Sequence, residues 1–235
     1  MDRHAATGER RAGARLMLSL SLTGGSEPLQ RVLAVGCHAD DIEIGCGGTL
    51  LTLTRALPDL EVTWIVLAAA GDREREARAS ADAFLGAADE VSFELHGFPD
   101  AFLPYVGGEV KEVFVDLGRR IEPQLVFTHT REDLHQDHRL ACELTWNTFR
   151  DCLIFEYEVP KVDGDLGRPN VYVPLRAAVA EEKIELLHQH FPTQVDKHWF
   201  DADTFRGLMR LRGMEANAEE RFAEAFTCRK LPLAP

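Results

Sequence analysis

The stretch RVLAVGCHADDIEIGCGG, residues 31–48, decides the fold of this chain. It opens with a short apolar run, residues 31–36, of the length and composition of a buried parallel strand. Polar residues follow at once, and then glycines that are typical of a helix start packed closely on a sheet. Because ligands bind outside the carboxyl ends of the strands in open α/β sheets, we expect a functional site where this strand ends.

Three further apolar runs, residues 62–67, 124–128 and 171–173, predict buried strands. Helical patterns alternate with them, which is typical of parallel strands joined by crossover helices. The sequence therefore predicts an α/β fold with a Rossmann-like, doubly wound, mostly parallel sheet flanked by helices.

Apolar residues at helical spacing indicate where these helices lie. Two further helical stretches are expected near residues 181–190 and 203–226. The apolar faces of the two earlier helices are formed by Ala77, Ala81, Phe84, Leu85 and Ala88, and by Val110, Val113, Phe114, Leu117 and Ile121 ahead of Pro123.

The N-terminal residues differ from the rest in pattern. We expect a flexible N-terminus over residues 1–15, followed at residues 16–22 by an edge strand, because leucine and serine alternate there with a period of two. No linker rich in proline, glycine or serine is long enough to separate a second domain. Residues 16–235 are therefore predicted to form a single domain.

The composition limits the classes of partner. The 235 residues carry 26 Lys and Arg against 39 Asp and Glu, so the net charge is −13. This charge disfavours nucleic acid and anionic membrane surfaces as partners. No apolar stretch approaches the ~18 residues of a membrane span, and the five cysteines include no C-x-x-C pair. We expect a cytoplasmic protein with reduced thiols.

Two clusters of histidine and aspartate follow predicted strands. His38, Asp40 and Asp41 come after the first strand. The second cluster is the run at residues 129–138 at the end of the strand at 124–128, which holds His129, Asp133, His135, Asp137 and His138. Either cluster alone is more typical of a solvated loop or of a helix N-cap. Two clusters that leave the same edge of one parallel sheet can bring imidazoles and carboxylates around one ion, which predicts a zinc site.

A catalytic zinc site needs three protein ligands, an open position for water and a carboxylate that accepts the proton of that water. The adjacent Asp40 and Asp41 can divide the roles of ligand and base between them. The glycines of Gly45-Cys46-Gly47-Gly48 leave two interpretations open. They can cradle a phosphate at a helix N-terminus, or they can permit close packing of helix on sheet.

Three motifs together resemble the LmbE/PIG-L family of zinc-dependent N-deacetylases, which includes N-acetylglucosaminyl deacetylases. They are His38-Ala39-Asp40-Asp41, the glycine-rich residues 45–48, and His135-Gln136-Asp137-His138. The segment Ala223-Glu224-Ala225-Phe226 also looks like a family motif. Ala39 stands where the family usually has proline, which leaves the backbone there less constrained.

The resemblance implies a role for individual residues. It makes His38, Asp41 and His138 the zinc ligands and Asp40 the general base. His135 would stabilise the oxyanion, and Asp137 would orient an imidazole. Arg73 and Asp100 lie where the family places groups that contact the substrate, although a solvated charge explains Arg73 equally well.

The function implied is the removal of an N-acetyl group from an amino sugar or a glycosylated small molecule, by water activated on Zn²⁺. Two alternatives stay open. One is a metal-dependent amidase acting on an N-acyl substrate that is not a sugar, and the other is a noncatalytic domain that binds a sugar or nucleotide. The expected partner is a small N-acetylated molecule, and self-association into a homo-oligomer is compatible with the sequence.

Overall fold

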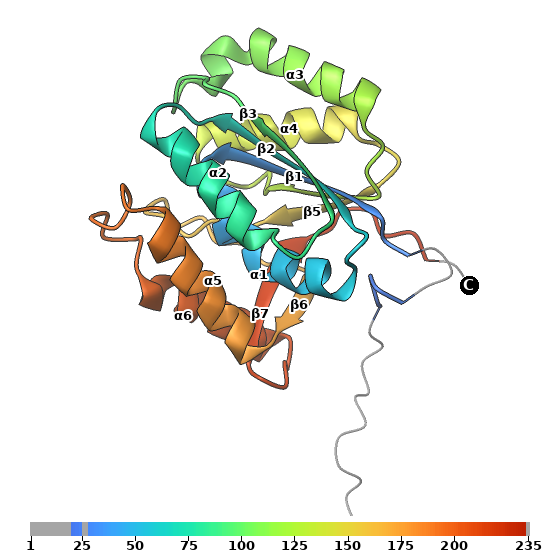
Figure 1. The fold of residues 1–235 in the computed structure, drawn as a ribbon, viewed down its shortest axis with the longest axis vertical. Coiled ribbons are helices and arrows are strands. Elements are labelled where there is room, and N and C mark those ends of the chain that lie inside the picture. The colour runs from blue at the N-terminus through green and yellow to red at the C-terminus, as the bar shows by residue number, and fades with distance from the viewer. Residues whose placement is uncertain (1–19, 25–27, 234–235) are drawn as a thin grey trace, which may run out of the picture.

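A computed structural model describes residues 20–24 and 28–233 of the chain. Its strands form one seven-stranded sheet in the order β3-β2-β1-β4-β5-β7-β6, with helices on both faces (Figure 1). The predicted α/β class, with a mostly parallel sheet flanked by helices, is confirmed.

In chain order the elements are β1 (Arg31–His38), α1 (Asp41–Ala56), β2 (Glu61–Ala68), α2 (Asp72–Phe84), β3 (Glu90–Leu95), the 3₁₀ helix η1 (Leu103–Val106), α3 (Gly107–Arg120), β4 (Leu125–His129), α4 (Gln136–Thr148), β5 (Leu153–Tyr157), β6 (Val171–Leu175), α5 (Ala177–His190), α6 (Ala202–Glu215) and β7 (Phe222–Thr227).

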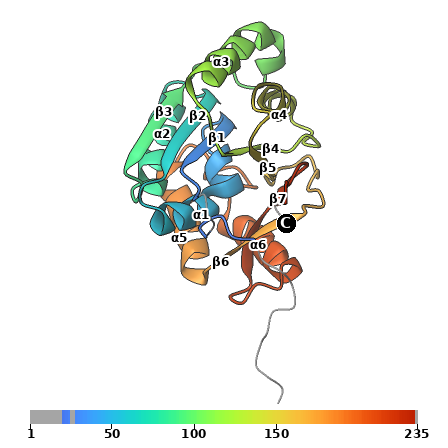
Figure 2. The ribbon, with the colours of Figure 1, turned by 90° about the vertical axis from the view of Figure 1, so that its right-hand side faces the viewer.

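The core lies in two layers, one on each side of the sheet. Successive side chains of a strand point to opposite faces, so Val32 and Ala34 of β1 pack with α1, α2 and α5, while Leu33 and Val35 pack with α3 and α4. Figures 1 and 2 both place α3 and α4 together on one side and α1, α5 and α6 on the other. Burial on both faces explains why the central strands are apolar almost throughout.

The chain reverses its direction across the sheet at β1. From β1 it runs outward through the parallel strands β2 and β3, and then returns to β4 on the opposite side of β1. This arrangement is the topological switch point of a doubly wound sheet, where a crevice forms at the carboxyl ends of the two central strands. The loops that follow β1 and β4 meet at that crevice.

The expected helix over residues 203–226 is wrong in its second half. Helix α6 ends at Glu215, and residues 222–227 form β7, which pairs antiparallel with β5 and β6. Asn217 and Arg221 adopt positive φ angles of 48° and 66°, so the chain folds back tightly after the helix. A Cβ on Gly213 would lie 2.2 Å from the carbonyl oxygen of Arg221, which explains a glycine at that position.

The N-terminal predictions have a mixed outcome. Residues 1–15, expected to be flexible, and residues 16–19 of the expected edge strand lie outside the described residues. Residues 20–22 are described and form no strand, so that part of the prediction is wrong. The single domain over residues 16–235 stays a prediction. Strands β3 and β5 were not anticipated.

Two expectations from composition concern the cysteines and the membrane. All five cysteines are free thiols. Over residues 20–24 and 28–233, none of the helices is both long and apolar enough to cross a bilayer.

The glycines that follow the first polar cluster serve close packing. A Cβ on Gly45 would lie 2.1 Å from the Tyr157 ring, and one on Gly48 would lie 2.6 Å from Leu175. The N–H groups of Gly48 and Thr49 donate to the two carboxylate oxygens of Glu224, at 2.8 and 2.6 Å. A carboxylate of the chain itself therefore occupies these donors, and the structure favours the packing interpretation over the phosphate cradle.

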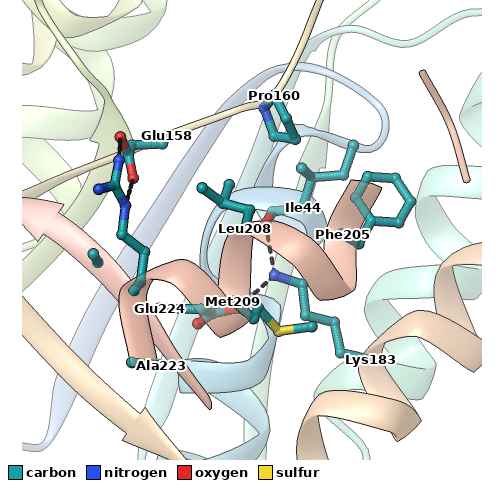
Figure 3. Close-up of a pocket in the computed structure, with 12 residues that line it drawn as sticks. Ile44, Glu158, Pro160, Lys183, Phe205, Leu208, Met209, Ala223 and Glu224 are labelled. Atoms are coloured by element: carbon teal, nitrogen blue, oxygen red, sulfur yellow. Dashed lines mark hydrogen bonds and ion pairs between the residues drawn. The ribbon is translucent and has the colours of Figure 1, made fainter. Parts of the chain in front are cut away.

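A buried ion pair completes this contact between α1 and β7. Lys183 of α5 donates to Glu224 and to the carbonyl oxygen of Ile44, both at 2.6 Å (Figure 3). In an α-helix the N–H of residue 48 faces the carbonyl of residue 44. Lys183 therefore contacts the acceptor of this i, i+4 pair, and Glu224 contacts its donor. The pair borders a cavity of about 20 Å³ beside α6, which is roughly enough for one water molecule.

The Gly45→Ala substitution should destabilise the protein because the new methyl group overlaps the buried Tyr157 ring. Overpacking of this kind costs ~1–3 kcal/mol, measured as the free energy of unfolding in urea. Gly107→Ala is the matched control, since its Cβ meets no atom of residues 20–24 and 28–233 within 4 Å. Equal stability of the two variants would contradict the packing role.

Lys183→Met should leave the buried Glu224 without its cation and lower the free energy of unfolding by ~3–5 kcal/mol. The double variant Lys183→Met/Glu224→Gln should lose less than the sum of the two single variants, because no unpaired charge remains. Additive losses in denaturant titrations would show that the two side chains do not act as a pair.

Candidate metal centre

The two polar clusters meet at the switch point of the sheet. His38 is the last residue of β1, and Asp41 is the first residue of α1. Strand β4 ends at His129, and the loop after it leads into α4, whose first turn carries His138. Parallel strands that end at one edge therefore bring together side chains that are far apart in the sequence.

Three side-chain atoms form a nearly equilateral triangle. His38 Nδ1 lies 3.2 Å from His138 Nε2 and 3.2 Å from Asp41 Oδ2, and the last two atoms are 3.4 Å apart. Ligands held at about 2.0–2.1 Å in a tetrahedron around Zn²⁺ are separated by about 3.3–3.4 Å. The chemistry of the donors and their spacing both fit zinc at the residues that the sequence predicts as ligands.

Asp41 is the electrostatic centre of this group. Its Oδ2 accepts a hydrogen bond from the His38 backbone N–H at 2.6 Å and lies 3.3 Å from Nε2 of His129. Burial acts to raise the pKa of Asp41, but the neighbouring imidazoles, above all that of His138, outweigh it and hold the pKa well below its usual range. Asp41 is therefore an ionised carboxylate, as a metal ligand must be.

His138 has its other ring nitrogen fixed by a carboxylate. Its Nδ1 lies 2.9 Å from Oδ2 of Asp133, a residue only 1% exposed. Burial acts to raise the pKa of Asp133, but the hydrogen bond and the charge of His138 outweigh it and hold the pKa well below its usual range. An ionised carboxylate only accepts hydrogen bonds, so Nδ1 carries the proton and Nε2 is free to ligate.

His38 is held in the same way from its far side. Its Nε2 lies 3.3 Å from Asp137 Oδ2 and 3.0 Å from Asp100 Oδ1. Asp137 is fully buried and also accepts from the Leu103 backbone N–H at 3.1 Å, whereas the Asp100 side chain is 77% exposed. The structure thus places Asp137 against the His38 imidazole, as the resemblance implies for an orienting residue. Asp100, which was expected to contact the substrate, lies against the same imidazole.

His135 lies at the rim of the same group. Its ring centroid is 4.9 Å from that of His38 and 4.6 Å from that of His138. Burial, followed by the charges of His138 and His38, lowers its pKa. Ring nitrogens of the three histidines lie within 4.8 Å of one another, so His135 can face either an ion or a substrate held beside it.

Asp40 is the N-cap residue of α1, and only one of its carboxylate oxygens is engaged. Its Oδ1 accepts from Arg73 at 2.6 Å, while its Oδ2 is buried and has no hydrogen-bond partner within the described part of the chain. Burial raises the pKa of Asp40 despite the opposing charge of Arg73. One oxygen is therefore fixed and the other is available to accept a proton.

Arg73 is tied to the site rather than solvated. Its guanidinium also donates to Glu76 at 2.8 Å and lies 5.4 Å from the centroid of the Phe191 ring. Glu76 in turn accepts from the backbone N–H of Thr193 at 2.8 Å. This network fixes the Arg73 guanidinium against Asp40. The nearest partner of Arg73 is therefore the residue that is expected to act as the general base.

Sequence reasoning missed a layer of residues behind the triangle. The fully buried His129 stacks on His138 with ring centroids 3.8 Å apart, and its Nε2 accepts from the Cys37 N–H at 3.0 Å. Burial and the charge of His138 lower the pKa of His129 to about 4, so it is neutral at pH 7. His129 and Asp133 belong to the second cluster, but only their contacts distinguish them from the other residues of that run.

These groups open into a pocket of about 680 Å³. This volume is within the usual range for small-molecule sites, about 300–1,000 Å³. The residues predicted as ligands, catalytic groups or substrate contacts all line the pocket, except Asp137, which is buried behind His38. The lining includes His38, Asp40, Asp41, Arg73, Phe98, Asp100, His135, His138, Val159, Lys161, Val162, Asp163, Lys197 and Trp199.

Comparison with known proteins accounts for this arrangement. The family described as "PIG-L: GlcNAc-PI de-N-acetylase" matches residues 33–149, the segment that holds both clusters. The chain belongs to the PIG-L family. This confirms the resemblance seen in the sequence motifs, and the roles of the individual site residues stay predictions.

Solved structures share the fold at low sequence identity. The conserved protein TT1542 from Thermus thermophilus is 22% identical over 88% of this chain and 97% of its own, with a TM-score of 0.69. The N,N'-diacetylchitobiose deacetylase from Pyrococcus horikoshii is 19% identical over 85% and 84%, with a TM-score of 0.64. The 4-carboxy-2-hydroxymuconate hydratase from Pseudomonas putida is 16% identical over 88% and 99%, with a TM-score of 0.70.

Asp133→Ala should weaken zinc binding by about 10–100-fold, because the carboxylate that orients His138 is lost. The dissociation constant can be measured by competition with a chromophoric chelator. Asp163→Ala, which removes an exposed carboxylate from the pocket lining, is the control and should bind zinc as the wild type does. Unchanged affinity in Asp133→Ala would contradict the orienting role.

Proposed function

We propose that this PIG-L family protein is a zinc-dependent hydrolase that removes an N-acetyl group from an amino sugar or a glycosylated small molecule. One observation carries the proposal: the His38–Asp41–His138 triangle has the spacing of zinc ligands and lies beside the Asp40 carboxylate, one oxygen of which has no partner among the described residues. Family membership supports the same reaction class. One of the similar structures is an N,N'-diacetylchitobiose deacetylase, which acts on an N-acetylated sugar.

Zn²⁺ bound by His38, Asp41 and His138 would polarise the amide carbonyl of the substrate and acidify a water molecule. Asp40 accepts the proton of the attacking water at Oδ2, while Arg73 fixes Oδ1. The raised pKa of Asp40 makes it a better base than an ordinary aspartate.

His135 faces the pocket and can donate to the oxygen on which negative charge develops. The amide C–N bond then breaks, and Asp40 returns its proton to the nitrogen that leaves. The products are acetate and a free amine. Asp137 and Asp133 keep the two imidazoles in place throughout.

Asp40→Asn should lower the turnover number by about 10²-fold or more, since general base catalysis contributes about 10²–10⁴-fold. Its zinc content should equal that of the wild type because Asp40 is not among the three proposed ligands. The assay follows acetate release from N-acetylglucosamine, N,N'-diacetylchitobiose and N-acetylated glycoconjugates, with loss on chelation and recovery with Zn²⁺.

Asp116→Asn serves as a matched control, because Asp116 is an exposed residue of α3 that pairs with Arg120, away from the pocket. Near-normal turnover of Asp40→Asn with zinc bound would refute the assigned base. Activity on non-sugar N-acyl compounds alone would keep the hydrolase and change the substrate. Zinc binding without acetate release from any compound would favour the noncatalytic alternative.

A further inference from the structure

Lys161 joins the loop between β5 and β6 to the proposed metal centre. Its side chain is 11% exposed, and its Nζ lies 2.9 Å from Oδ2 of Asp133 and 2.6 Å from Oδ2 of Asp165. The two carboxylates are 1% and 5% exposed. Solvent therefore screens this contact far less than it screens an ordinary surface ion pair.

The Asp133 carboxylate connects Lys161 to a proposed zinc ligand. The oxygen that accepts from Lys161, Oδ2, also lies 2.9 Å from Nδ1 of His138, while Oδ1 accepts from the backbone N–H of His135 at 2.8 Å. The Asp133 carboxylate thus links Lys161 both to the His138 ring and to the loop that carries His135.

Asp165 provides a second link between the same two loops. Its Oδ2 accepts from the Leu134 backbone N–H at 2.7 Å as well as from Lys161. The Lys161 ammonium therefore lies between one carboxylate of the loop that leads into α4 and one of its own loop. Removing the ammonium would leave two buried carboxylates without their shared cation.

The loop of Lys161 is anchored at its base by contacts with α6 and within the loop itself. Glu158 pairs with Arg212 of α6 at 2.6 Å and accepts from the backbone N–H of Gly167 at 3.2 Å. Between these anchors, residues 159 and 161–163 form one wall of the pocket. Val162 and Asp163 are exposed there, so Lys161 is the side chain of this wall that reaches inward to the partner of a proposed ligand.

We propose that Lys161 is a positioning residue that couples metal binding at His138 to the order of the pocket wall formed by residues 159–163. This inference rests on the proposed zinc site. An ion on Nε2 of His138 makes Nδ1–H a stronger donor, which holds Asp133 more firmly, and Asp133 in turn holds Lys161 and its loop. Coupling is reciprocal, so a wall that metal orders must contribute to the affinity for metal by the same factor.

The test compares Lys161→Met with the wild type in two measurements that need no substrate. The zinc dissociation constant of Lys161→Met should rise about tenfold or more, which is the usual effect of losing an outer-shell partner. Hydrogen exchange of the amides of residues 159 and 161–163 should slow when zinc is added to the wild type. In Lys161→Met this protection should disappear, while zinc still protects α4.

Three further variants sharpen the comparison. Lys161→Arg keeps the charge and should retain most of the zinc affinity. Asp165→Asn keeps Lys161 but weakens one of its partners, so it should shift both measurements less and in the same direction, and it tests the proposal if Lys161→Met does not fold. Lys230→Met removes an exposed lysine that donates to the Arg150 carbonyl, away from the pocket, and should match the wild type.

Zinc affinity and loop protection equal to the wild type in Lys161→Met would overturn the coupling. A raised KM with unchanged zinc affinity would also overturn it, because Lys161 would then contact the substrate directly. Failure of the wild type itself to bind zinc would instead refute the metal site on which the proposed function depends.

Discussion

The parallel pairing of β1 with β4 is the constraint on which the rest of the structure depends. Val32, Leu33 and Ala34 pair with Leu125, Val126 and Phe127, and this contact joins two halves of the chain that run outward in opposite directions. Because both strands end at the same edge of the sheet, the loops that follow them lie close together. Two sequence clusters, each ordinary when taken alone, become one site with the spacing of metal ligands.

The sequence was sufficient for the α/β class and for the place where the two clusters meet, although strands β3 and β5 were not anticipated. Buried parallel strands have a distinctive apolar pattern, and the dense runs at 38–41 and 135–138 lie where such strands end. It was insufficient for β7, because Phe222 and Phe226 are spaced by four and fit a helix as well as a strand. It was also insufficient for Lys161 and Lys183, whose importance lies in long-range contacts that leave no local pattern. Asp133 lies only five residues before His138, but nothing in that run distinguishes it from the other carboxylates.

Membership of a family and similarity of fold answer different questions here. The family match over residues 33–149 covers the two polar clusters and all of the proposed ligands. The similar structures include both a deacetylase and a hydratase, so the doubly wound sheet by itself does not determine a reaction. The chemistry that we propose rests on a few side chains at the switch point, above all the arrangement of Asp40, Asp41 and the imidazoles around them.

The contact between β7 and α1 has a consequence for the order in which contacts can form while the chain is being synthesised. During translation, the segment that holds both histidine and aspartate clusters is finished well before residues 183 and 224 are made. Helix α1 then still lacks the partners of the Gly48 and Thr49 amides and of the Ile44 carbonyl. The nascent chain therefore carries every proposed ligand at a stage when the helix that positions Asp41 is not yet locked in place.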